Sequence, residues 1–397
     1  MKKAFSFLLF VICLNNLFAF QDSDEKNSLK GLYLSASFGV INYDYSENLL
    51  IGNYETTGIT GRNAFAGRFS VGYHLTEKWD IEFSVMRPGA WVQYNFDEPR
   101  KFDKSVWTNI WALSGRRNFR FFSNTRLYLE AGISNVSRTG FDINKEVVIP
   151  SVRYIYPITS AGLLYPISSK IDAAINFTYS PQSNKYNQPA TSFIAGGIVY
   201  HVREQSDEVK NKYLNTEYKF PDHLFHIGYA SDAAGFNINR QFSSGLDTSI
   251  PMFWLGDVFV ENGITASYQK NIFHTEKNFS FSAGASLSYL NTQKDESFYT
   301  ISVFPVIKWW FLRTKPVDLY FNYSLIGPAY ISSSVLDGLD TGEEFTFQDF
   351  MGIGFLFGKG RNYNLDLKIA HYSNGNIFTD NPGVAVPLML SFGYALY

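Results

Sequence analysis

The sequence predicts an all-β protein made of two tandem eight-stranded antiparallel transmembrane β-barrels joined by a charged linker. Of its 397 residues, 45% are hydrophobic and 18% are aromatic, yet the mean hydropathy is slightly negative at -0.12. The apolar residues alternate with polar ones instead of gathering in long runs, and the alternation stops once, near the middle of the chain. Strands of about ten residues with this alternation are typical of outer-membrane barrels.

The N-terminus predicts export from the cytoplasm. Met1-Lys2-Lys3 is followed by an apolar run from residue 4 to 14, which is the pattern of a secretory signal peptide. We expect residues 1–19 to form this signal, with cleavage after Ala19. The rest of the sequence contains no run of about 18 apolar residues, so no membrane helix is expected. The single cysteine, Cys13, lies inside the signal, which leaves the mature chain without disulfide or thiol chemistry.

Residues 29–203 are expected to form the first barrel. Short and long connections alternate between its amphipathic segments, as periplasmic turns and external loops do in such barrels. Thr76-Glu77-Lys78 is one of the tight turns. The eight expected strands lie near residues 31–40, 68–75, 79–85, 104–120, 124–140, 149–165, 169–180 and 190–203.

The polar face of the first barrel carries acidic and basic side chains together. Eight strands enclose an interior that side chains fill. We therefore expect these charges to pair with one another in a structural network instead of lining a channel. They are Arg68, Glu82, Arg126, Glu130 and Asp172.

Residues 204–219 interrupt the alternation with a charged stretch, which we interpret as a linker. The alternation resumes in residues 220–397, the expected second barrel. Its final strand ends on the aromatic Tyr397, the usual form of an outer-membrane barrel terminus, so we expect the barrel-assembly machinery as a partner. One sixteen-stranded pore is the alternative, but the linker favours two barrels. The expected strands lie near residues 224–236, 254–272, 278–291, 297–312, 315–331, 345–358, 362–373 and 386–397.

His371 and Ser373 form the core of the candidate site. They continue the odd-numbered apolar face of a strand over residues 363–373, so both side chains point to the side expected to face lipid. A base and a hydroxyl on the same side of a strand can share a proton. The turn near residues 358–361 is expected to be periplasmic, and a spanning strand has about 9 to 11 residues. The pair is therefore expected at the outer-leaflet end, with a lipid as its substrate.

Asp349 is the candidate acid. It interrupts an apolar face of the preceding strand, and a hairpin centred on Gly360 would place it opposite His371. Opposed side chains lie about 5 Å apart at Cβ, so the carboxylate could hold the imidazole as in a hydrolase triad. An unpaired charge on a lipid face costs about 2 to 4 kcal/mol at the midplane. Each residue alone also fits an ordinary polar position at the membrane interface.

The C-terminal part of the chain resembles a known family, the lipid A 3-O-deacylases of the PagL type. The resemblance implies an eight-stranded barrel whose exterior active site removes the ester-linked acyl chain at the 3-position of lipid A. The substrate would be lipid A of lipopolysaccharide in the bacterial outer membrane. The resemblance runs through Ile326-Gly327-Pro328-Ala329-Tyr330, Phe345-Thr346-Phe347-Gln348-Asp349, Gly352-Ile353-Gly354, His371-Tyr372-Ser373-Asn374 and Asn381-Pro382-Gly383.

The same resemblance implies a role for each matched side chain. His371 matches the base, Ser373 the nucleophile, and Asn381 an asparagine that assists the oxyanion. Backbone amides of the adjacent loop, Asn374-Gly375-Asn376, would support the same oxyanion. The first half is similar to small OmpA-like barrels in general pattern only, which implies membrane residence and no particular activity.

One position departs from the family: the catalytic glutamate is replaced by Ala385. Either Asp349 or the nearby Asp380 substitutes for it, or the site is weakened or inactive. The alternatives to an esterase are therefore a catalytically impaired structural or lipid-binding barrel and a single sixteen-stranded pore. We expect no cofactor, no metal site, because the six histidines are scattered, and no nucleic-acid binding, because the net charge is only -2.

Overall fold

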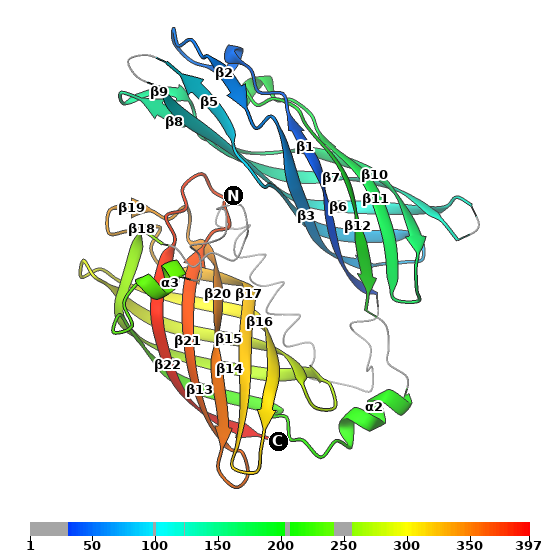
Figure 1. The fold of residues 1–397 in the computed structure, drawn as a ribbon, viewed down its shortest axis with the longest axis vertical. Coiled ribbons are helices and arrows are strands. Elements are labelled where there is room, and N and C mark those ends of the chain that lie inside the picture. Colours follow the sequence, from blue (N-terminus) through cyan, green and yellow to red (C-terminus); the bar gives the residue numbers. More distant parts are fainter. Residues whose placement is uncertain (1–30, 98–100, 123, 203–206, 242–255) are drawn as a thin grey trace. The chain divides into compact units, whose positions relative to one another are not determined.

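The structure is a computed structural model that describes residues 31–97, 101–122, 124–202, 207–241 and 256–397 (Figure 1). The predicted signal peptide, residues 1–19, lies outside the described residues. Contacts between residues divide the chain into two compact units, with Glu25–Glu204 in one and Gln205–Tyr397 in the other. The domain limits inferred from the sequence, including the linker at residues 204–219, stay predictions.

The first unit is a closed antiparallel barrel. Neighbouring strands pair in the order β6-β4-β3-β1-β12-β11-β10-β7, and pairing of β6 with β7 closes a ring of eight strands within the described residues. Short strands β2 and β5 extend β6 beyond this ring. The bounds are β1 Leu32–Tyr43, β2 Gly58–Thr60, β3 Asn63–His74, β4 Trp79–Pro88, β5 Val92–Phe96, β6 Phe102–Arg120, β7 Arg126–Thr139, β8 Phe141–Ile143, β9 Glu146–Ile149, β10 Val152–Pro166, β11 Ile171–Ser180 and β12 Thr191–His201.

Ion pairs fill the end of the first barrel where its two chain ends lie. Arg68 Nη2 lies 3.1 Å from Glu82 Oε1, and Arg116 Nη2 lies 3.3 Å from Glu130 Oε2. The Tyr33 hydroxyl donates to Glu82 Oε2 at 2.9 Å. The predicted internal network is therefore confirmed, with Arg116 as a further member. All five predicted side chains take part in ion pairs: Arg68, Glu82, Glu130, Arg126 and Asp172.

The loop end of the first barrel is filled with apolar and aromatic side chains. The cluster includes Ile41, Tyr43, Tyr94, Phe96 and Phe193, each buried. Ion pairs occupy one end of the barrel interior, and aromatic and apolar side chains occupy the other. Side chains therefore fill the interior along its length, as expected for eight strands. The first unit is therefore built as a closed structural barrel.

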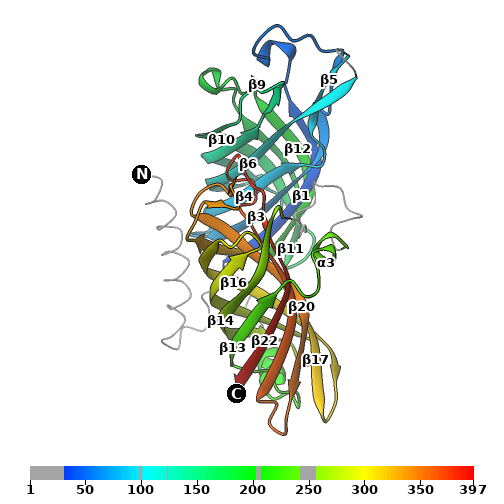
Figure 2. The ribbon, with the colours of Figure 1, turned by 90° about the vertical axis from the view of Figure 1, so that its left-hand side faces the viewer.

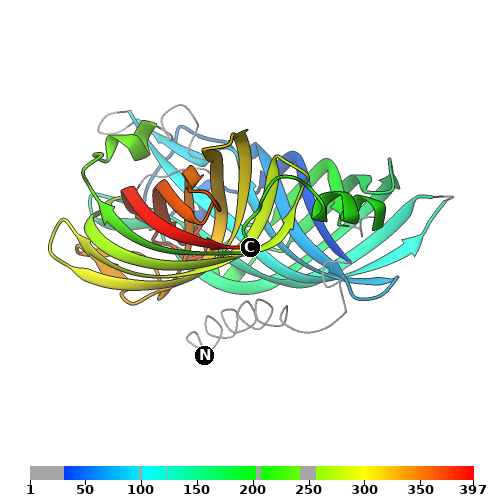
Figure 3. The same cartoon turned by 90° about the horizontal axis from the view of Figure 1, so that it is seen from below.

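The second unit closes on itself in the same way. Its ring runs β13-β14-β15-β16-β17-β20-β21-β22, and β13 pairs with β22. Figure 2 shows β13, β14 and β22 side by side, and Figure 3 shows β22 running to the C-terminus. Two closed rings confirm the predicted pair of barrels over the described residues and contradict the sixteen-stranded alternative. The bounds are β13 His223–Ser231, β14 Val258–His274, β15 Phe279–Thr292, β16 Ser297–Arg313, β17 Val317–Ile331, β20 Phe345–Phe357, β21 Tyr363–Ser373 and β22 Val384–Leu396.

Helices and short strands lie at the two ends of the second barrel. The helix α3, Asn237–Gln241, and the short strands β18, Val335–Leu336, and β19, Leu339–Asp340, lie at the end opposite the C-terminus (Figure 1). The helix α2, Asp207–Leu214, lies within the charged stretch that we interpret as a linker. Within the described part of the chain, no helix is both long enough and apolar enough to span a membrane.

The strand β13 ends earlier than the sequence pattern predicts. Alternation predicts a strand to residue 236, but residues 232–235 form a turn. The Gly235 N–H donates to the Asp232 carbonyl oxygen at 2.7 Å, and Gly235 has a φ of 69°. A left-handed backbone of this kind favours glycine and ends the strand.

Candidate active site

The ladder between β20 and β21 places Asp349 directly opposite His371. This is the register predicted from a hairpin centred on Gly360, and it is confirmed. The His371 Nδ1 atom lies 3.0 Å from Asp349 Oδ1. A carboxylate at Nδ1 favours the tautomer that carries its proton there, so Nε2 becomes the basic nitrogen of the ring.

The pair lies on the outer wall of the second barrel. Tyr372, between His371 and Ser373 in β21, points inward, where its hydroxyl accepts hydrogen bonds from Gln348 Nε2 at 3.0 Å and Thr300 Oγ1 at 3.2 Å. Successive side chains of a strand point to opposite faces. His371 and Ser373 therefore both point outward, at the end of β21 far from its turn with β20. Neighbouring groups cover the acid–base pair there, because His371 is 4% exposed and Asp349 is 9% exposed.

The Ser373 hydroxyl is held by the loop that follows it. Asn381 Nδ2 donates to Ser373 Oγ at 3.0 Å, and the Gly375 N–H donates to the same oxygen at 3.3 Å. Asn381 Nδ2 also donates to Asn376 Oδ1 at 2.8 Å. Two donors thus converge on Ser373 Oγ, an arrangement that can stabilise negative charge close to that atom.

Asn374 and Asn381 together fix the shape of the loop. The Asn374 N–H donates to Asn381 Oδ1 at 2.9 Å, while its side-chain amide donates to the carbonyl oxygens of Thr341 at 2.8 Å and Asp380 at 2.6 Å. Asn374 therefore ties the loop after β21 to the loop before β20. The sequence reasoning did not single out Thr341, because nothing in a strand pattern reports contacts between irregular loops.

Asp380, the other candidate acid, has a different surrounding from Asp349. Its carboxylate accepts a hydrogen bond from Thr379 Oγ1 at 3.0 Å, and its backbone oxygen accepts the Asn374 amide. Asp349 is the candidate whose carboxylate contacts the imidazole. The structure thus brings Asp349 to His371, and it brings Asn381 and Gly375 to Ser373.

Residues 262–395 match the family model described as Lipid A 3-O-deacylase (PagL). The predicted resemblance of the second half to the PagL family is thereby confirmed over these residues. A comparison with curated proteins gives no match. With this family match, the closed barrels locate the chain in the bacterial outer membrane.

Several solved structures are similar to one barrel of this chain. The outer membrane enzyme PagL is 16% identical, with a TM-score of 0.29, over 44% of this chain and 99% of its own. Neisserial surface protein A (NspA) is 15% identical, with a TM-score of 0.31, over 44% of this chain and 98% of its own. The outer membrane protein OprG from Pseudomonas aeruginosa is 13% identical, with a TM-score of 0.31, over 45% and 100%.

The structure places the residue that departs from the PagL family, Ala385, directly beside His371. Ala385, at the position of the family glutamate, is the partner of His371 in β22, while Asp349 is its partner in β20. Directly opposed side chains lie about 4.5–5.5 Å apart at Cβ. The imidazole therefore has an acid on one side and a methyl group on the other, and both positions are within reach of it.

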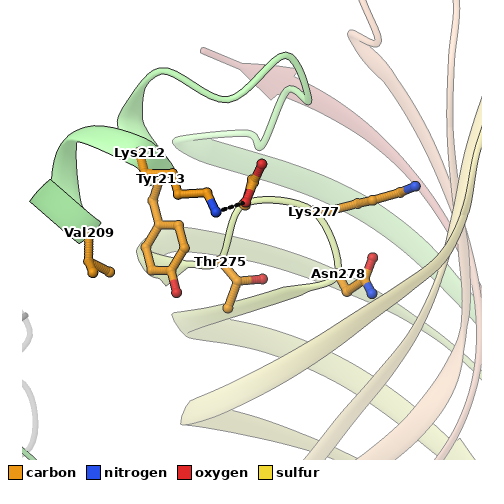
Figure 4. A pocket seen from close by; sticks show the side chains of 7 residues that line it. Val209, Lys212, Tyr213, Thr275, Lys277 and Asn278 are labelled. Atoms are coloured by element: carbon orange, nitrogen blue, oxygen red, sulfur yellow. Dashed lines mark ion pairs between the residues drawn. The ribbon is translucent and has the colours of Figure 1, made fainter.

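A hollow beside α2 lies far along the chain from this site. Its volume is about 350 Å³, and Val209, Lys212 and Tyr213 of α2 line it with residues 275–278 (Figure 4). Lys212 Nζ lies 3.0 Å from Glu276 Oε2 there, which fastens α2 to the turn after β14. Among the described residues no cluster of three or more His, Cys, Asp or Glu side chains could hold a metal ion.

Proposed function

We propose that the second unit is an outer-membrane serine esterase that removes an ester-linked acyl chain from lipid A. One observation carries the proposal: an Asp349–His371 pair joined at 3.0 Å on the outer wall, two residues before Ser373, inside the segment that matches the PagL family. Lipid A would reach these side chains from within the outer leaflet. No cofactor takes part in the proposed reaction.

The proposed reaction has two halves. His371 Nε2 takes the hydroxyl proton of Ser373 as the serine side chain turns toward it, and Oγ attacks the acyl carbonyl carbon. The tetrahedral intermediate expels the sugar oxygen, which receives the proton from the imidazolium. Water then attacks the acyl-enzyme with His371 as base, and the fatty acid leaves while Ser373 recovers its proton.

Each remaining side chain has a supporting role in this proposal. Asp349 stabilises the imidazolium that forms at His371. The Asn381 amide and the Gly375 N–H already point at Ser373 Oγ, so they lie close to the carbonyl oxygen of a bound ester and can stabilise its negative charge. Asn374 and Asn376 keep the loop in this shape. At the C-terminus, β22 and Tyr397 are the part we expect the barrel-assembly machinery to recognise.

Mass spectrometry of lipid A tests the proposal. Cells that express the wild type should contain lipid A that lacks one acyl chain, whereas cells that express Ser373→Ala should retain it. Ser333→Ala is the control. Ser333 is a loop serine after β17, and its hydroxyl donates a hydrogen bond to the Val335 carbonyl oxygen. Identical lipid A in wild type and Ser373→Ala would contradict hydrolysis and favour the impaired lipid-binding barrel that Ala385 suggests.

A further inference from the structure

The outer wall of the first barrel carries an unusual row of polar side chains. Ser137 of β7 is paired with Asn109 of β6 on one side and with Arg153 of β10 on the other. Met86 of β4 is paired with Ile110, so the same register places the next residue, Arg87, beside Asn109. Arg87, Asn109, Ser137 and Arg153 thus form one row across four neighbouring strands.

The side chains of this row point away from the barrel interior. Their neighbours in sequence point inward: Met86, Ile110 and Val136 belong to the apolar cluster inside the barrel. Alternation then turns Arg87, Asn109 and Ser137 to the outer wall, where neighbouring side chains leave Asn109 and Ser137 only 1% and 3% exposed. Arg153 follows the same rule, because Tyr154 is part of the internal cluster.

The row lies at the outer end of the membrane span. Arg87 is the ninth residue of β4, which starts at the tight turn of residues 76–78. A spanning strand has about 9 to 11 residues, so Arg87 reaches the level of the outer headgroups. The guanidinium groups of Arg87 and Arg153 are separated by three strand spacings of about 4.8 Å each.

The row is confined to one side of the barrel. Val40 is the ninth residue of β1, and its partners are Phe65 in β3 and Ile194 in β12. These three outward side chains are 55%, 64% and 62% exposed, and all are apolar. On the opposite wall, the outward residues at the ninth position of the strand are thus all apolar. Depth in the membrane alone therefore does not explain why the row through Arg87 is polar.

Tryptophans lie against Arg87 and beside the residue that Arg153 contacts. Arg87 Cζ lies 4.7 Å from the centre of the Trp107 ring, and Trp91 packs edge-on against Trp107 with centroids 3.7 Å apart. One row closer to the membrane centre, Trp111 is paired with Asn135, whose Oδ1 accepts a hydrogen bond from Arg153 Nε at 3.1 Å. Guanidinium groups match phosphate oxygens, and indole rings suit the boundary between headgroups and acyl chains.

From this combination we infer that the row is a binding site for a phosphorylated, multiply acylated lipid of the outer leaflet. Arg87 and Arg153 bind its phosphate groups, Asn135 binds its polar headgroup, and the tryptophans contact the first part of its acyl chains. Asn109, which is 1% exposed, lies beneath them. The inference concerns the first barrel and does not depend on the hydrolysis proposed for the second. Removing the charges should weaken binding of this lipid without changing the reaction at Ser373.

Binding of lipid A to the purified full chain in detergent tests the inference. The chain carries Ser373→Ala so that no lipid is consumed. Native mass spectrometry counts the lipid molecules bound to each chain, and a titration gives the Kd of each. We expect Arg87→Gln and Arg153→Gln each to raise the Kd of one bound lipid A molecule about tenfold, and the double variant to raise it about a hundredfold. Changes of this size are typical for the loss of hydrogen bonds to a charged group. Enzymatically dephosphorylated lipid A should bind wild type and double variant equally.

Arg117→Gln is the matched control. Arg117, in β6, packs over a tryptophan as Arg87 does, with Cζ 5.4 Å from the centre of the Trp79 ring, but it lies at the periplasmic end of its strand. Its loss should leave binding unchanged. Arg87→Lys with Arg153→Lys keeps both charges and should retain most of the affinity, and the heat-dependent mobility of each variant on a gel reports its folding.

Four outcomes would overturn the inference. One is unchanged lipid A binding in a folded double variant. Another is an equal loss for phosphorylated and dephosphorylated lipid, which would remove the role of phosphate; competition by inorganic phosphate alone would instead indicate a simple anion site. The last is a change in the oligomeric mass of the double variant with lipid binding intact, which would make this wall a contact with a second copy of the chain.

Discussion

The imidazole of His371 lies between two positions that could carry its acid, and only one of them has a carboxylate. Asp349 is its partner in β20 and Ala385 is its partner in β22. In a triad the acid fixes the tautomer of the base and stabilises its charged form. Either flanking strand can offer a carboxylate to the ring, and this geometry gives a physical reason why the family glutamate could be lost without loss of the acid.

Asp349→Asn should therefore abolish most of the proposed activity. An asparagine amide donates a hydrogen bond to Nδ1, which moves the ring proton to Nε2 and leaves no base for Ser373. A comparable change in a serine protease lowers kcat about 10⁴-fold. Initial rates of acyl release from purified lipid A would measure the loss.

A second substitution distinguishes a lost acid from a damaged barrel. Adding Ala385→Glu to Asp349→Asn places a carboxylate on the other side of His371 and should restore part of the rate. Adding Ala385→Gln should not, because it supplies similar volume without charge. A rate that Asp349→Asn leaves unchanged would remove Asp349 from the reaction.

The strands and the loops of this site differ in how far the sequence predicts them. The opposition of Asp349 and His371 was predictable because a period of two and a known turn fix the register of a whole hairpin. The bonds of Asn381 to Ser373 and of Asn374 to Thr341 were not, because they depend on irregular backbone. Only the resemblance to the family suggested a role for Asn381.

At the scale of elements, the same contrast appears along the chain. Most strands lie where alternation predicted them, but the stretch that contains α2 has no apolar periodicity, so the helix gave no signal in the pattern. The register of β21 with β22 also shifts between Lys368, paired with Met389, and Ala370, paired with Val386. Such an irregularity changes which residue of β22 stands beside His371, and alternation alone does not report it.

The loop before β20 provides a test at this scale. Gly342 has a φ of 105°, and a Cβ there would lie 2.7 Å from Phe378 Cδ2 and 2.8 Å from Asn374 Nδ2. Gly342→Ala should therefore push the Asn374 anchor away from Thr341 and disturb the loop that holds Ser373. We expect the esterase rate to fall by about one to two orders of magnitude, as expected when groups are displaced by about 1 Å.

Gly338→Ala is the matched control for this loop. Gly338 also has a positive φ, of 77°, but a Cβ there meets no atom within 4 Å. Both substitutions therefore carry backbone strain, and only the first adds a collision with the anchor. Equal rates for the two variants would show that the position of Asn374 does not matter for the reaction. Hydrogen exchange of residues 374–381 would report the loop directly.

At the scale of the whole molecule, each barrel closes with its own strands. The ring of the first unit is completed by β6 and β7, and that of the second by β13 and β22. No backbone pairing between the units is needed to close either ring over the described residues. Closed rings satisfy their backbone hydrogen bonds internally, which is the main requirement for stability in a bilayer.

The second unit should therefore fold and act without the first. We expect a shortened chain that joins residues 1–28 to residues 205–397 to reach the outer membrane, because α2 and the complete β13–β22 ring are retained. A heat-dependent change in gel mobility would show that it is folded, and mass spectra of lipid A would show loss of one acyl chain. The same shortened chain with Ser373→Ala is the control. A folded but inactive shortened chain would mean that the first barrel takes part in the reaction, and the lipid-binding row through Arg87 and Arg153 would then be the first surface to examine.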